Sequence, residues 1–186
     1  MPRAPVRIVG AALRAARRRT RARRCWIGFC AALSVALAVT LAAPPRPRLL
    51  WNASASAPIG LWRIVPGGRV GRGDMVVARL GQPWRDLAAR RHYLPANVPL
   101  LKRVAAAPGD RVCAFGPWIF VEGRVVARRR GADRWGRPLP WWHGCRTLKD
   151  GAMLLMMDDP ASFDGRYFGP VERRAVVGKA VPLWLR

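Results

Sequence analysis

The chain has 186 residues, of which 51% are hydrophobic, and its 34 Lys and Arg against 10 Asp and Glu give a formal net charge of +24. The length suits one domain of ordinary size. The hydrophobic fraction excludes a wholly disordered basic protein, and four Cys in a chain of this length exclude a small disulfide scaffold. So large a positive charge raises the question of a nucleic-acid partner, which its distribution helps to answer.

The positive charge is concentrated near the N-terminus and is almost entirely Arg. Residues 1–24 hold nine Arg and no acidic residue, which leaves +15 for the other 162 residues. The basic residues comprise 31 Arg and only three Lys, which are Lys102, Lys149 and Lys179. Because Lys can be deprotonated at a functional site and Arg cannot, each Lys in so Arg-rich a chain is a candidate for chemistry.

Residues 25–43 form an uncharged apolar run that predicts a transmembrane helix. Its nineteen residues at about 1.5 Å each span roughly 28 Å, close to the ~30 Å hydrocarbon thickness of a bilayer. The positive-inside rule keeps the basic arm, residues 1–24, in the cytoplasm and exports everything after the run. A cleavable signal peptide is the alternative, but the run is long for its hydrophobic region, and Pro44 follows directly.

Export changes how the cysteines of the remaining chain are interpreted. An oxidising compartment allows a disulfide between Cys113 and Cys145, and closing the loop between them stabilises the fold by roughly 3–4 kcal/mol through loop entropy. His143 beside Cys145 suggests a metal ligand pair, but with one other Cys and the distant His92 the ligands are too few. We therefore predict the disulfide and no metal.

Short hydrophobic runs separated by Gly and Pro predict a β-rich domain at residues 51–186, behind a Pro-rich spacer at residues 44–50. The runs include DMVVARL, PLLKRVAAA, WIFVEGRVVARR, AMLLMM and RAVVGKAVPLWL. Glu122 and Gly123 predict a hairpin turn within one of them. Residues 84–92 form the one segment that suggests a short helix, so we expect a mainly β domain with one core.

The first segment that suggests chemistry is residues 51–60, WNASASAPIG. Small residues at nearly every position let a substrate backbone approach Ser54 or Ser56 closely, and the Pro that follows prevents helix formation. A plain Ser/Ala linker explains the same composition. The segment also matches the glycosylation acceptor pattern at Asn52, a pattern of low specificity.

The second segment is residues 100–110, LLKRVAAAPGD. In a strand, Leu100, Lys102 and Val104 share one face, so Lys102 is expected to point inward with two aliphatic neighbours. Burial lowers the pKa of an ammonium group, and a Lys base needs a fall from about 10.4 to near 7–8. A surface position is the alternative, and it is the better interpretation for Lys149 and Lys179.

The third segment is residues 158–170, DDPASFDGRYFGP, which combines acids, a hydroxyl, an Arg and turn formers. Asp164 and Arg166 can pair, and Ser162 can donate to or accept from a neighbour. An acidic loop that binds a cation is the alternative, but Arg166 in its middle argues against a metal site.

The three segments in this order, behind an apolar run, resemble the type I signal peptidase family of Ser/Lys proteases, and more specifically the conjugative-transfer (TraF-like) signal peptidases. The resemblance covers most of residues 50–183. It implies a signal-peptidase-like β-fold catalytic domain with no cofactor. It also implies a single-pass protein of the bacterial inner membrane, with the catalytic domain in the periplasm.

Carried over position by position, the resemblance implies that Ser56 is the nucleophile and Lys102 the general base. The backbone N–H of Ser56 and the hydroxyl of Ser54 are expected to form the oxyanion hole. A Ser-His-Asp triad is the rival arrangement. Neither His92 nor His143 lies near a Ser-containing segment in the sequence, which disfavours the triad.

The resemblance also implies supporting roles in the third segment. Ser162 is expected to orient the Lys102 amine, and Asp164 with Arg166 to hold the loop. The sequence departs from the family pattern at two positions, with Ala57 where Met is common and Gly165 where Ser is frequent.

The expected partners are the lipid bilayer and a membrane-bound precursor with a signal or leader segment, such as a pilin or another conjugative-transfer protein. A general signal peptidase I is the alternative within the same class. The alternative of a different class is a membrane-anchored basic assembly module without enzymatic activity. No nucleic-acid-binding motif accompanies the positive charge, so we expect no nucleic-acid partner.

Overall fold

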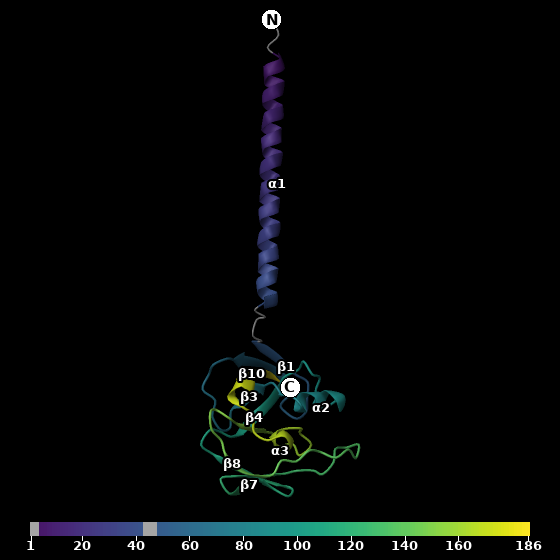
Figure 1. Cartoon of the computed structure of the whole chain (residues 1–186), viewed down its shortest axis with the longest axis vertical. Coiled ribbons are helices and arrows are strands. Elements are labelled where there is room, and N and C mark those ends of the chain that lie inside the picture. The colour runs from purple at the N-terminus through teal and green to yellow at the C-terminus, as the bar shows by residue number, and fades with distance from the viewer. Residues whose placement is uncertain (1–3, 43–47) are drawn as a thin grey trace. The chain divides into compact units, whose positions relative to one another are not determined.

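The computed structural model describes residues 4–42 and 48–186 (Figure 1). The chain divides into two compact units, Met1–Arg46 and Pro47–Arg186. The first contains the long helix α1 (Ala4–Ala42), and the second contains all ten strands of the described residues. The β-rich domain was predicted to begin at residue 51, and the first strand of the second unit, β1, begins at Leu49. The rest of the predicted spacer up to residue 47 lies outside the described residues.

Helix α1 is longer than the predicted apolar run because the basic arm before it is also helical. Ala and Arg are strong helix formers, and the arm consists largely of these two residues. The segment Arg17–Ala42 is long and apolar enough to cross a membrane, and none of its most apolar window is buried inside the protein. This helix is compatible with a membrane anchor.

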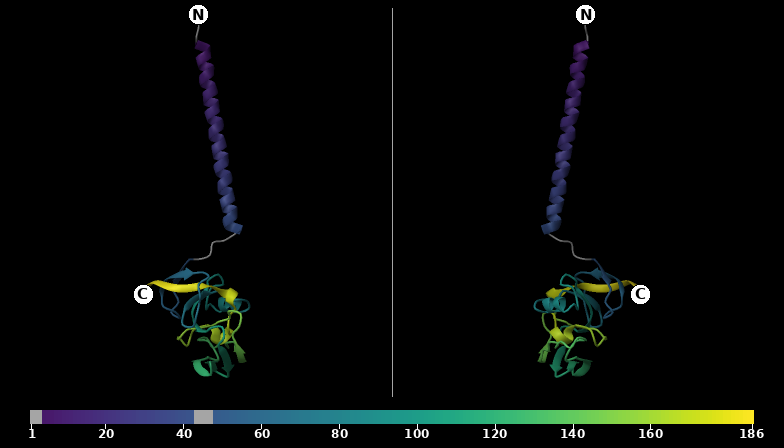
Figure 2. Two further views of the ribbon diagram at one scale, coloured as in Figure 1. Left: turned by 90° about the vertical axis from the view of Figure 1, so that its left-hand side faces the viewer. Right: turned by 90° about the vertical axis from the view of Figure 1, so that its right-hand side faces the viewer.

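Six strands form one antiparallel sheet in the order β1-β2-β10-β3-β4-β9. They are β1 (Leu49–Asn52), β2 (Gly60–Val65), β3 (Met75–Ala78), β4 (Leu100–Ala106), β9 (Leu154–Met156) and β10 (Val176–Leu185). The last strand, yellow in Figure 2, pairs with β2 on one side and with β3 on the other. Strands from the two ends of this domain therefore meet in the middle of the sheet.

Four strands form a second antiparallel sheet in the order β7-β6-β5-β8. They are β5 (Arg111–Phe115), β6 (Trp118–Val121), β7 (Arg124–Arg128) and β8 (Gly144–Thr147). The predicted hairpin turn joins β6 to β7, and Glu122 and Gly123 both have the positive φ of a type I′ turn, 50° and 73°. Cys113 on β5 faces Cys145 on β8, and the two form a disulfide with Cα atoms 4.0 Å apart.

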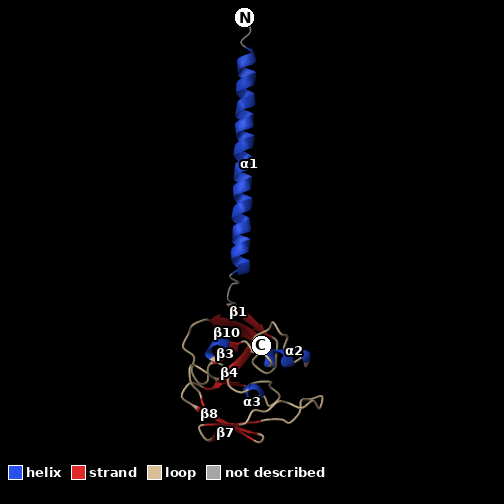
Figure 3. Cartoon of the chain, in the orientation of Figure 1, coloured by secondary structure: helices blue, strands red, loops and turns tan. Residues whose placement is uncertain are grey.

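The helices of the β-rich domain are short (Figure 3). Helix α2 (Trp84–Arg90) lies within the segment predicted to be helical and ends before His92, whose φ is 57°. Two further helices, α3 (Gly165–Phe168) and the 3-10 helix Arg173–Ala175, were not predicted, because one turn is too short to show a helical period. The prediction of a mainly β domain behind one apolar helix is confirmed.

The core covers both faces of the central strands. Val77 and Leu101 belong to one apolar cluster, and Val76 and Val104 belong to another. One face of β4 is buried along its whole length and carries Lys102, which is only 3% exposed. The other face is buried at Leu101 and partly exposed at Arg103 and Ala105.

Candidate active site

The loop between β1 and β2 carries the two candidate serines, and a buried amide shapes it. Asn52, the last residue of β1, faces Gly60, the first residue of β2. The Asn52 Nδ2 donates to the carbonyl oxygens of Ser54, Ala57 and Pro58, each at 3.0 Å, and its Oδ1 accepts from the Ser54 N–H at 3.1 Å. One side chain thus fixes the backbone of the whole loop.

Gly60 closes this loop at a point where no side chain fits. Its φ is 151°, and a Cβ atom there would lie 2.1 Å from the backbone oxygen of Trp184 on β10. The glycine of the WNASASAPIG segment is therefore required by the close approach of β10.

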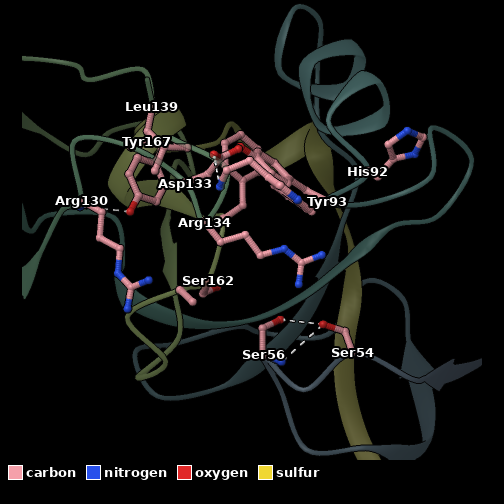
Figure 4. A pocket seen from close by; sticks show the side chains of 14 residues that line it. Ser54, Ser56, His92, Tyr93, Arg130, Asp133, Arg134, Leu139, Ser162 and Tyr167 are labelled. Carbon is pink, nitrogen blue, oxygen red and sulfur yellow. Dashed lines mark hydrogen bonds between the residues drawn. The ribbon is translucent and has the colours of Figure 1, made fainter. Parts of the chain in front are cut away.

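Ser56 lies at the surface of the domain, half-buried, with Ser54 beside it (Figure 4). The two Oγ atoms are 2.9 Å apart, and the Ser56 N–H donates to Ser54 Oγ at 3.3 Å. The hydroxyl of Ser56 is thus accessible from solvent and already belongs to a hydrogen-bonded group. This ordered loop differs from the flexible linker that its composition also allowed.

Lys102 reaches Ser56 from the interior. Its Nζ lies 3.0 Å from Ser56 Oγ and 2.7 Å from Ser162 Oγ. Burial lowers the pKa of Lys102 to about 8, while the charges of Asp164 and Asp159 raise it and that of Arg166 lowers it further. With a pKa of about 8, roughly a tenth of the amine is neutral at pH 7.

The other two lysines have the surface positions expected of them. Lys149 is exposed. Lys179 is partly exposed, and its Nζ forms an ion pair with Asp74 at 2.7 Å. Among the three lysines, deep burial and contact with two hydroxyl groups are confined to Lys102.

The loop that carries Ser162 is closed by a buried ion pair. Arg166 and Asp164 are 2% and 0% exposed, and their side chains make two contacts, Nη2 to Oδ2 at 2.7 Å and Nε to Oδ1 at 2.9 Å. Arg166 Nη2 also donates to the carbonyl oxygens of Met157 and Asp159 at 2.6 and 2.7 Å. This pair therefore ties the start of the loop to its end and places Ser162 against the amine.

The structure gives a physical reason for Gly165, one of the two departures from the family pattern. A Cβ atom at this position would lie 2.7 Å from both the Leu155 backbone oxygen and Leu154 Cδ1. A serine there would force β9 away from α3. Ala57, the other departure, is buried in the apolar cluster that contains Val77 and Leu101.

Two cavities meet at Ser54 and Ser56. The larger, about 450 Å³, is mainly apolar and includes Leu50, Trp51, Leu94, Val98, Leu100 and Leu101 among its lining residues, with Lys102. The smaller, about 300 Å³, is drawn in Figure 4 and includes Arg130, Asp133, Arg134, Trp135, Ser162 and Tyr167. Tyr93 and Phe163 line both cavities, and their ring centroids are 5.1 Å apart.

Several residues of this site were not predicted from the sequence. Asn52 attracted attention as a glycosylation acceptor, but its side chain is 8% exposed and its amide is fully used within the loop. Phe163 lies between the candidate residues Ser162 and Asp164 in the third segment, and this position in the sequence indicated that it lies near the site. Tyr93 carries no local signal.

The histidines take no part in the hydrogen bonds around Ser56. His92 lines the smaller cavity. Among the described residues, Ser56 Oγ has hydrogen bonds with Ser54 and Lys102 and with neither histidine. This arrangement differs from a Ser-His-Asp triad.

The family model described as signal peptidase, peptidase S26 matches residues 21–185. The chain therefore belongs to the signal peptidase S26 family, and this membership supports a serine-type peptidase with a signal-peptidase-like function. The resemblance predicted from the three segments is confirmed.

Similar proteins include conjugal transfer protein TraF of Agrobacterium fabrum, 32% identical over 143 residues that cover 72% of this chain and 80% of that protein. A plasmid transfer protein TraF of Escherichia coli is 35% identical over 138 residues, which cover 67% of this chain and 76% of that protein. A second TraF of Escherichia coli is 42% identical over 82 residues, and the match spans only 46% of its length. A signal peptidase I of Enterococcus faecalis has a TM-score of 0.35 and 19% identity, covering 60% of this chain and 97% of that structure.

Proposed function

We propose that the chain is a membrane-anchored endopeptidase that uses Ser56 and Lys102 as a catalytic dyad to cleave the signal or leader segment of an exported precursor. One observation carries the proposal: the amine of Lys102 is buried between two hydroxyl groups, 3.0 Å from Ser56 Oγ and 2.7 Å from Ser162 Oγ. A basic assembly module without activity has no need of such an arrangement.

In the acylation step, the neutral amine of Lys102 accepts the proton of Ser56, and the Oγ attacks the carbonyl carbon of the scissile bond. The ammonium then protonates the leaving amine as the peptide bond breaks, which leaves an acyl-enzyme. In the second step, Lys102 takes a proton from water as the water attacks the ester carbonyl, and it returns that proton to Ser56 Oγ as the ester bond breaks. Ser162 accepts a hydrogen bond from the amine throughout and so holds its lone pair toward Ser56.

The oxyanion formed in each step requires hydrogen-bond donors, and in this structure the expected donors are engaged in other hydrogen bonds. The N–H of Ser56 is the backbone donor, but in this structure it donates to Ser54 Oγ. Rotation of the Ser54 side chain frees that N–H and turns the Ser54 hydroxyl into a second donor. Each donor of this kind is worth about 3–4 kcal/mol in the transition state.

The apolar cavity supports a precursor with apolar or small residues beside the cleaved bond. It is continuous with Ser56 and is lined by side chains of β1 and β4, such as Trp51 and Leu101. The printed names of the similar TraF proteins refer to conjugal or plasmid transfer. We therefore propose that the precursor is a pilin or another conjugative-transfer protein.

The N-terminal unit supports a location at the inner membrane. The exposed apolar surface of Arg17–Ala42 suits a lipid bilayer, and the nine Arg of residues 1–24 favour a cytoplasmic N-terminus. This orientation exports the domain that begins at β1, so the precursor is cleaved at the outer face of the membrane.

The test uses the purified full chain in detergent micelles with candidate pilin precursors and, in parallel, a general export precursor. Mass spectrometry of the products is expected to show one cleavage in a pilin precursor, none with Ser56→Ala, and little or none in the export precursor. Equal cleavage of both precursors would favour a general signal peptidase. Cleavage by Ser56→Ala would contradict the proposed nucleophile.

A further inference from the structure

The smaller cavity at Ser56 carries positive charge that the protein itself does not neutralise. Arg130 and Arg134 line it, and both are exposed. Within residues 4–42 and 48–186, neither forms an ion pair with a carboxylate. The neighbouring Arg166 and Arg137 differ, since each is paired with an Asp.

The one acidic residue lining this cavity in the described part of the chain, Asp133, is already used. Its Oδ2 accepts from the Tyr93 hydroxyl and from Arg137 Nε, both at 2.6 Å. Its Oδ1 accepts from the N–H groups of Trp135 and Arg137, both at 2.9 Å. Asp133 therefore shapes the loop and leaves the charges of Arg130 and Arg134 for a ligand.

Arg134 lies against an aromatic ring at the cavity. Its Cζ is 3.9 Å from the centroid of the Trp135 ring, which Arg137 also contacts at 4.5 Å. A cation–π contact does not use the N–H groups of a guanidinium, and these match the two oxygens of a carboxylate. Figure 4 shows the Arg134 side chain extending into the cavity above Ser56 and Ser54.

The two cavities at Ser56 are both mainly apolar and differ in the number of cations that line them. Lys102 is the one basic residue among those that line the larger, whereas two exposed guanidinium groups, those of Arg130 and Arg134, line the smaller. A peptide bound across Ser56 has its residues on one side of the scissile bond in apolar surroundings and those on the other side near uncompensated positive charge.

We propose that Arg130 and Arg134 determine specificity by binding a carboxylate of the substrate within a few residues of the scissile bond, on the side opposite the apolar cavity. The inference rests on the proposed endopeptidase function. The carboxylate has two possible sources, an Asp or Glu side chain and the C-terminal carboxylate of a short peptide, and the guanidinium chemistry is the same for both.

The experiment uses the full chain in detergent micelles and a library of synthetic peptides. Each peptide has a Leu-rich segment and Ala residues on one side and randomised positions on the other, and each is made both as a free acid and as a C-terminal amide. Mass spectrometry identifies the cleaved peptides, and kcat/KM is then measured for matched pairs that differ only in Glu against Gln or in acid against amide.

We expect cleavage to favour the carboxylate member of one of the two pairs by about fivefold, the range of a partly exposed ion pair, and the preference to shrink at high salt. The pair that shows the preference identifies the source. The combined change Arg130→Gln and Arg134→Gln is expected to bring the ratio near one, and Arg134→Glu to favour Lys over Glu. Arg124→Gln, an exposed Arg on β7, is the control that keeps the wild-type ratio.

The outcomes separate the two proposals. Cleavage without a carboxylate preference, or with a preference that survives in the double variant, overturns the specificity role and leaves the Ser/Lys dyad untouched. If no peptide of the library is cleaved by wild type, the endopeptidase function fails, and the specificity role fails with it.

Discussion

Strand β4 and the loop that closes at α3 each bury one basic side chain, and they treat it in opposite ways. Arg166 is 2% exposed and meets a carboxylate through two hydrogen bonds, so it stays charged. Lys102 is 3% exposed and its amine contacts two hydroxyl groups and no carboxylate, so the effect of burial is only partly offset and its pKa falls to about 8. The protein thus keeps one buried cation charged and lowers the pKa of the other toward the range that the proposed base requires.

The strongest test of this difference replaces the buried lysine by the residue type that always stays charged. Lys102→Arg is expected to lower kcat/KM by at least about a thousandfold, because a guanidinium stays protonated and cannot accept the Ser56 proton. Processing of a precursor by mass spectrometry measures the loss, and circular dichroism checks the fold. Lys179→Arg is the matched control, since its ion pair with Asp74 requires only a positive charge. Normal processing by Lys102→Arg would contradict the dyad.

The second test removes the carboxylate from the buried pair. Asp164→Ala is expected to destabilise the domain by about 3–5 kcal/mol, because Arg166 is left as an uncompensated buried charge. Urea unfolding of the full chain in micelles measures the change. Glu172→Ala breaks the exposed pair with Arg174 and is expected to change stability by about 1 kcal/mol or less. Equal effects of the two changes would show that burial does not distinguish the pairs.

A smaller loss is expected at the oxyanion hole. Ser54→Ala removes one of the two donors and is expected to reduce kcat by about a hundredfold, with a smaller change in KM. Ser56→Ala, in contrast, is expected to leave no measurable activity. Single-turnover kinetics on a cleaved peptide distinguishes the two variants. If the two effects were reversed, the nucleophile would be Ser54.

The smallest expected effect is the pH dependence of the wild type. The folded-state pKa of Lys102 is lowered to about 8, and the proposed active form is the neutral one, so kcat/KM is expected to rise with pH, to be half-maximal near pH 8 and to level off above about pH 9. The value at pH 7 is then roughly a tenth of the plateau. A profile measured from pH 6 to 9.5 checks this, and a fall in kcat/KM from pH 7 to 9 would contradict a lysine base.

The two residues of the proposed dyad could be identified as candidates from short segments because each segment carries a local pattern. Lys102 stands among aliphatic residues in a strand, and Ser56 lies in a run of small residues. The alternation along β4 placed Lys102 on the face that is buried throughout, although Leu101 on the other face is buried as well. The burial of Lys102 follows from the packing of β4 between two clusters, which no single segment specifies.

The residues that form the walls of the two cavities at Ser56 could not be predicted in the same way. Tyr93 donates to Asp133 from 40 positions away, and Arg91 Nη1 donates to the Pro138 carbonyl from 47 positions away. Both contacts depend on tertiary folding and leave no periodic signal in the sequence. The role of Asn52 was missed for a different reason, since a single Asn in a loop has many uses and its five-residue reach to Ala57 becomes visible only in the fold.

The position of β10 has a consequence for when the candidate site is assembled. In the sheet order, Ser56 follows β1 on one side of β10, and Lys102 lies on β4 on the other side. Strand β10 alone connects β2 to β3 within this sheet, and its backbone also packs against Gly60 at the end of the Ser56 loop. Ser56 and Lys102 are therefore brought together only when residues 176–185 have joined the sheet, so the candidate site is completed by the last strand of the domain.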